Sequence, residues 1–122
     1  MNSKNVKEKF VEVQELYKSG DLHGAINILN ELISIEPNSA KLRGTLANTY
    51  WELKNYEEAN KQFKKSIELA PEWEDVSLGL FHCLWEQDRK EEAFAEMKRF
   101  MTISTSEEYK KILKDINEEK PM

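Results

Sequence analysis

The chain is poor in cysteine, glycine and proline, with one, four and three of them among 122 residues. The lone Cys83 excludes an internal disulfide framework, and so few glycines and prolines argue against a turn-rich all-β domain. No stretch approaches the roughly 18 consecutive apolar residues of a membrane span, and the N-terminus lacks the apolar core of a signal peptide. These absences predict a helical, cytoplasmic protein that makes no use of a membrane.

Charge of both signs is abundant, with 34% charged residues, 39% hydrophobic residues and a formal net charge of −5. This hydrophobic content is enough for a folded core. The acidic balance gives no electrostatic basis for gripping nucleic-acid phosphates, so we expect no nucleic-acid partner. The length fits a single domain over residues 1–122.

Residues that carry out catalysis or bind metals are also scarce. The only histidines are His23 and His82, and no glycine-rich phosphate loop is present. On a helix, His82 and Cys83 would point about 100° apart, which suits a packed thiol beside an exposed imidazole better than a metal site. We therefore predict no catalytic residues, no metal and no cofactor, and a protein that is not an enzyme.

A period of 34 residues organises what is present. The alanines of three similar segments, Ala25, Ala59 and Ala93, are spaced by this interval. The same interval relates Leu29, Phe63 and Met97, then Leu16, Tyr50 and Leu84, and finally Pro37 and Pro71. A shared period across several positions indicates an array of structural repeats.

Each period contains two apolar runs at helical spacing, separated by a short polar break. In the second period the first run extends from Leu42 to Leu53 and the second from Tyr56 to Ala70. Pro71 then stops the helix. In the third period the second run includes Phe94, which is expected to face the core. Each repeat is therefore expected to be a helical hairpin.

This combination resembles the tetratricopeptide-repeat family, over about residues 6–107 in units 6–39, 40–73 and 74–107. The resemblance implies an all-α fold, a right-handed α-solenoid of three helical hairpins and a C-terminal capping helix, seven helices in all. The sequence departs from the family pattern where a large aromatic residue is usual near the start of each unit, and in the missing third proline. The residues at these places are Lys9, Arg43, Ser77 and Thr105.

A final amphipathic run over residues 108–120 is expected to be the capping helix. Tyr109, Ile112, Leu113 and Ile116 share one face of it, with lysines and acids on the other. A stacked array needs such a cap because its last unit otherwise exposes an apolar face.

The resemblance places the binding site on the concave face, where partner segments commonly bind. The first helix of each unit has a stripe rotated away from its core face, which begins at positions 10, 44 and 78. The stripe contributes an aromatic column (17, 51, 85) and a column of amide or imidazole groups (14, 48, 82). Neighbouring charges are basic toward the first unit (7, 18, 41) and acidic toward the last (52, 75, 86). The predicted partner-binding residues are Phe10, Gln14, Tyr17, Lys41, Asn48, Trp51, Asp75, Leu78, His82 and Trp85.

Each of these features has an alternative explanation. The aromatic column could flank the core, and the amides and charges could form an ordinary solvated surface. The leading function is a non-catalytic adaptor or scaffold that binds a peptide or partner protein in the groove. The alternatives are a dedicated neutraliser of one protein, such as an immunity protein or secretion chaperone, and a self-assembling structural unit whose oligomeric state the sequence leaves open.

One kind of partner is disfavoured. Family members that clamp the C-terminal carboxylate of heat-shock chaperones use lysine, asparagine and arginine at five places of the groove. Here those places are Phe10, Gln14, Thr45, Asp75 and Gly79. Because Asp75 would repel a carboxylate, we expect the chain not to bind chaperone tails in that way.

Overall fold

A computed structural model describes residues 3–118 and contains seven α-helices and no strand in that range. The helices are α1 (Ser3–Ser19), α2 (Leu22–Ile35), α3 (Ala40–Glu52), α4 (Tyr56–Leu69), α5 (Glu74–Glu86), α6 (Lys90–Ile103) and α7 (Glu107–Glu118). The predicted all-α class is confirmed. Residues 119 and 120 of the predicted capping helix lie outside the described residues.

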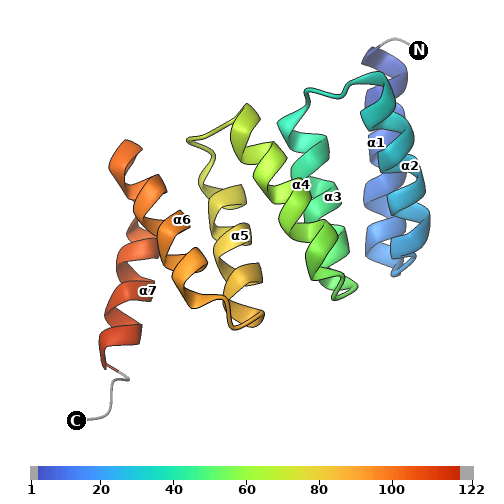
Figure 1. The fold of residues 1–122 in the computed structure, drawn as a ribbon. Coiled ribbons are helices and arrows are strands. Elements are labelled where there is room, and N and C mark those ends of the chain that lie inside the picture. The colour runs from blue at the N-terminus through green and yellow to red at the C-terminus, as the bar shows by residue number, and fades with distance from the viewer. Residues whose placement is uncertain (1–2, 119–122) are drawn as a thin grey trace.

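The helices form consecutive antiparallel hairpins stacked side by side along the chain (Figure 1). In this view α2, α4 and α6 lie in front of α1, α3 and α5, so the molecule has two layers. Helices α2 and α4 each pack against the first helix of their own hairpin and against the first helix of the next. We call the layer of α1, α3 and α5 the concave face.

Three equivalent residues make the turns within the hairpins. Gly20, Lys54 and Asp88, spaced by 34 residues, all have positive φ, with values of 88°, 61° and 59°. This left-handed conformation reverses the chain after the first helix and is least strained at glycine. The second helices α2 and α4 end two residues before Pro37 and Pro71.

The core has two clusters of buried residues. One joins α1, α2 and the first half of α3, with Val13, Leu29 and Leu46 nearly or completely buried. The other cluster contains residues from the second half of α3 and from α4, α5, α6 and α7, and it is centred on Phe63 and Phe81. The first hairpin therefore meets the second through its own smaller core.

Two glycines allow the second and third hairpins to approach closely. A Cβ atom on Gly79 would lie 2.6 Å from Cε1 of Phe63, and one on Gly44 would lie 3.2 Å from Cγ2 of Val76. Gly44 is buried. The helical spacing predicted Gly44 on the groove stripe, and that prediction is wrong because the helix turns this position toward the next hairpin.

The capping helix α7 is held by a buried aromatic ring and a polar network. Tyr109 is 0% exposed, and its ring packs against Phe81 and Phe100 with centroid distances of 5.5 and 5.9 Å. Its hydroxyl lies 2.8 Å from the Ser77 hydroxyl, which donates at 2.6 Å to the buried carboxylate of Glu96. Ser77, in place of the family's large aromatic residue, thus leaves room for a polar link between α5, α6 and α7.

Candidate functional site

The concave face is hollowed between α1 and α3. Two adjoining hollows, of about 350 and 410 Å³, share Phe10 and Gln14 in their walls. We call the space they form the α1–α3 cleft, and its walls are Val6, Lys7, Phe10, Val11, Val13, Gln14, Tyr17, Lys18, Glu36, Ser39, Lys41, Leu42, Thr45 and Asn48. Four of the ten predicted binding residues, Phe10, Gln14, Tyr17 and Asn48, lie together around it, and Lys41 lines one of its two hollows.

The walls of the cleft combine apolar surface with exposed polar groups. Phe10 is half-buried, and the ammonium of Lys41 lies 4.4 Å from the centre of its ring. Gln14 and Asn48 are exposed, and within residues 3–118 their side-chain amides form no hydrogen bond. These amides are therefore available to a ligand's backbone.

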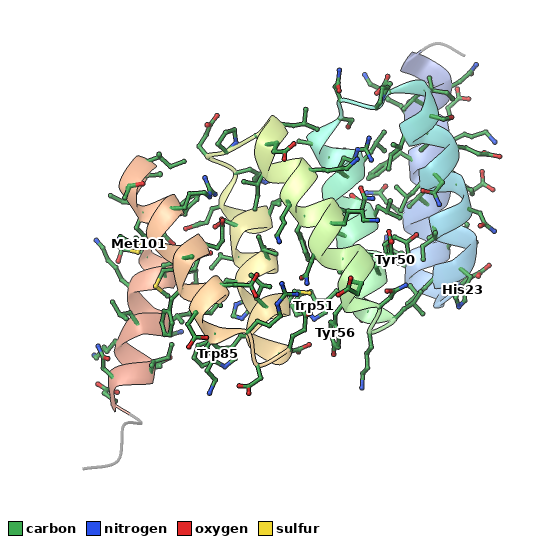
Figure 2. The ribbon with its side chains drawn as sticks, viewed as in Figure 1. His23, Tyr50, Trp51, Tyr56, Trp85 and Met101 are labelled. Carbon is green, nitrogen blue, oxygen red and sulfur yellow. The ribbon has the colours of Figure 1, made fainter. Side chains whose placement is uncertain are left out.

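The aromatic column is tied from one hairpin to the next by acidic side chains. Nε1 of Trp51 donates a 2.8 Å hydrogen bond to Oε2 of Glu86, and the Tyr56 hydroxyl donates to the same oxygen at 3.3 Å. Figure 2 shows Trp51 and Tyr56 close together near the turn of the second hairpin. Partial burial, followed by the charge and hydrogen bonding of Glu52, raises the pKa of Tyr17.

Both pairs join an aromatic residue to the acid 35 positions later, 17 with 52 and 51 with 86. The sequence pattern suggested only that these acids line the groove, and it did not reveal that each interacts with an aromatic residue of the preceding unit. The constant offset is visible in the sequence and could have indicated the pairing. The position 35 residues after Trp85 is Lys120, which lies outside the described residues.

The two tryptophans also have close aromatic neighbours. Trp51 stacks on His82 with centroids 6.5 Å apart and planes at 3°. Trp85 packs on Phe81 and Phe94 at 5.7 and 5.6 Å and has the ammonium of Lys90 5.1 Å from its ring. The helical spacing predicted Phe94 on the core stripe of its helix, but 36% of it is exposed beside Trp85.

The remaining predicted residues lie apart from the cleft. Leu78 is half-buried against the larger core cluster, and Asp75 is exposed in the first turn of α5. A smaller hollow of about 210 Å³ is lined by Trp51, Glu52, Lys54, Tyr56 and Glu86. The structure thus divides the ten predicted residues between the cleft and the α3–α5 part of the same face.

Cys83 is 0% exposed, as predicted for a packed thiol, and His82 is exposed. Burial, followed by the charge of Glu86, raises the pKa of the Cys83 thiol to about 11. In residues 3–118 no group of three or more His, Cys, Asp and Glu side chains is arranged to hold a metal ion. Over the same range, no helix has the length and hydropathy needed to cross a bilayer.

Sequence comparison matches residues 16–72 to the tetratricopeptide-repeat family. Over 57 residues, 47% of this chain, the sequence is 32% identical to Hsp70-Hsp90 organizing protein 2 of Arabidopsis thaliana. The match spans only 10% of that much longer protein.

Solved structures of low sequence identity share the fold. The TPR2B domain of yeast Sti1 in complex with pHsp70 has a TM-score of 0.74 at 20% identity, covering 80% of this chain and 78% of that one. The second TPR of Spaghetti (RPAP3), bound to an HSP90 peptide, has a TM-score of 0.73 at 18% identity, with 81% and 92% covered. MamA has a TM-score of 0.76 at 18% identity, with 84% and 56% covered. Residues 16–72 therefore match tetratricopeptide repeats in sequence, and the 34-residue period and the stacked helical hairpins continue the same repeat pattern on either side of them.

Proposed function

We propose that this chain is a non-catalytic interaction module that binds a segment of a partner protein along its concave face. The observation that carries the proposal is the α1–α3 cleft, where apolar walls lie beside exposed amides that form no hydrogen bond within the described chain. Apolar surface with a few convergent polar groups is typical of binding sites. A cytoplasmic location is part of the proposal and is supported by the single cysteine.

The relatives suggest the kind of ligand, a peptide, but their own ligands are not proposed for this chain. Two similar structures are complexes with pHsp70 or with an HSP90 peptide. Of the five places of the chaperone-tail clamp, the two in the third unit hold Asp75 and Gly79 in this chain. Neither residue carries the positive charge that would hold a carboxylate. The hydroxyl of Thr45 already donates a 2.8 Å hydrogen bond to the carbonyl oxygen of Lys41. This chemistry favours a ligand held by other contacts than a clamped terminal carboxylate.

Adaptor function is favoured over self-assembly by the chemistry of the capping helix. The exposed surface of α7 carries Lys110, Lys111 and Lys114, and its one exposed large apolar side chain among the described residues is Leu113. Lys110 forms an ion pair with Glu107, and Lys114 forms one with Glu118. A charged, solvated outer face does not continue a stack. Neutralisation of one cognate protein would use the same groove and differs from an adaptor only in the identity of the partner.

The test is partner binding by a cleft variant. Tyr17→Ala/Asn48→Ala removes two exposed walls of the cleft, and Ile35→Ala/Leu69→Ala removes two exposed aliphatic side chains on second helices as a matched control. We expect affinity for a partner captured from the source cells to fall roughly ten-fold or more in the cleft variant, as for interface anchors. The control should bind like the unaltered protein, with helicity checked for both.

Unchanged affinity in a folded cleft variant would contradict the proposal and move the site to another face. A Trp51→Ala/Trp85→Ala variant extends the test to the rest of the aromatic column. Because Trp51 also bonds Glu86, its unfolding curve must be measured before lost binding is assigned to the groove.

A further inference from the structure

We infer that the α1–α3 cleft selects an extended acidic segment of a partner protein, with one apolar side chain between side-chain carboxylates. The inference rests on the proposed function and names the chemistry of its ligand. It depends on three features of the cleft: an apolar centre, ammonium groups at both ends, and amides between them.

The apolar centre is formed by Phe10, which belongs to both hollows. Val13 below it is buried, and Val11 at the outer rim is 54% exposed. The volume of each hollow suffices for a large aliphatic or aromatic side chain. An apolar residue of the ligand would bury its own surface and that of Phe10 together.

Lysines mark both ends of the cleft. Lys7 lines the hollow at one end and Lys18 lines the hollow at the other, whereas the ammonium of Lys41 lies between them, 4.4 Å from the centre of the Phe10 ring. All three lysines are exposed. Lys18 follows Lys7 by eleven residues on α1, which at 1.5 Å per residue is about 16 Å along the helix axis. An extended chain covers that distance in about five residues at ~3.3 Å each. Carboxylates two or three positions before and after the apolar residue would therefore reach the two ends.

One acidic group lines the cleft and a second interacts with a residue of its wall, and both limit where the ligand's carboxylates can lie. Glu36 lines the hollow that contains Lys7 and Lys41, so two ammonium groups face one carboxylate there. At the other end, Glu52 is engaged with Tyr17 and leaves Lys18 as the cation of that hollow. The rest of the concave face carries further carboxylates, those of residues 75 and 86, which disfavour an acidic ligand there.

The amides of Gln14 and Asn48 project from opposite walls of the hollow that contains Lys18. Each offers a donor and an acceptor, which matches the alternating N–H and C=O groups of an extended backbone. The amides fix the position of the segment, and the lysines select its side chains.

The experiment is a selection from random twelve-residue peptides displayed on phage, against the full chain. Enriched peptides are then synthesised with amidated and with free C-termini. Their affinities are measured by fluorescence anisotropy for the unaltered protein, for Lys7→Glu/Lys18→Glu/Lys41→Glu, and for a control, Lys65→Glu/Lys98→Glu/Lys111→Glu. The control makes the same charge change at exposed lysines outside the cleft.

We expect the enriched peptides to carry an apolar residue between acidic ones and to bind equally well with either C-terminus. Reversing the cleft lysines should weaken binding roughly ten-fold more than the control does, since each exposed ion pair contributes modestly and several act together. Backbone amide shifts should map the bound peptide to α1 and α3.

Three results would overturn the inference. Basic or uncharged peptides bound at α3 and α5 would refute the acidic ligand while leaving the concave-face proposal intact. Peptides that need a free C-terminus would assign the lysines to a terminal carboxylate. Failure to enrich any peptide, or binding outside the concave face, would refute both the inference and the proposed function.

Discussion

Replacing Tyr109 by alanine is expected to lower the free energy of unfolding by about 3–5 kcal/mol, the usual cost of truncating a buried aromatic residue. The ring is the only side chain of α7 that is fully buried in the described chain, and it packs on Phe81 and Phe100. Its loss should release α7 and expose the apolar end of the stack. Urea unfolding followed by circular dichroism measures the effect, and hydrogen exchange should show earlier loss of protection in α7.

Tyr109→Phe is the matched control, since it keeps the ring and removes only the hydroxyl contact with Ser77. The Ser77 hydroxyl retains its bond to Glu96. We expect a cost of about 0.5–1.5 kcal/mol, typical of one hydrogen bond. A similarly small cost for Tyr109→Ala would mean that α7 does not cap the stack.

Replacing Phe63 by alanine should be about equally destabilising, by about 3–5 kcal/mol. Phe63 is 1% exposed, meets Trp51 edge-on at 6.4 Å, and fills the space left by Gly79. Chemical unfolding of the single variant measures the cost, which should be accompanied by a change in tryptophan fluorescence because Trp51 loses a neighbour.

The contact with Gly79 supplies a sharper control. In the unaltered protein, Gly79→Ala should destabilise by about 1–3 kcal/mol through overpacking, against a gain in helix propensity of about 1 kcal/mol. In the Phe63→Ala background the obstructing ring is absent, so Gly79→Ala should be neutral or stabilising. Equal effects in both backgrounds would show that the ring does not set the approach of α4 and α5.

The all-α fold follows from the sequence because its determinants are periodic. The 34-residue interval between Ala25, Ala59 and Ala93 predicts that they have equivalent environments, and all three are completely buried. Local signals likewise predict the ends of α2 and α4, where Pro37 and Pro71 follow the last helical turn. Because the same pattern occurs in three units, each unit supports the prediction made from the others.

The contacts between hairpins were harder to predict because they depend on how far each unit rotates on the next. Helical spacing alone put Gly44 in the groove, although the packing of the third hairpin covers it. The same rotation brings Glu86 to Trp51, and no single-helix pattern contains that contact. The contact of Ser77 could not be predicted for the same reason. The sequence shows only that Ser77 departs from the family pattern, whereas its hydrogen bond with Tyr109 depends on how α7 packs on α5.

For the candidate site, the sequence predicted which residues share a face but not how they divide along it. Gln14 and Asn48 were expected in equivalent positions, and the structure places both at one cleft. His82, the third member of the column, instead stacks on Trp51. The difference arises because a cleft is present between α1 and α3, whereas glycines close the packing between the second and third hairpins.

The most direct test of the concave face as the binding surface is photo-crosslinking inside the source cells. A benzophenone amino acid replaces Gln14 in the cleft, and a matched protein carries it at Asn27, an exposed position on α2. If the concave face holds the partner, one protein should be crosslinked from position 14 and not from position 27. Crosslinking from position 27 alone would contradict binding at the concave face and assign it to the opposite layer.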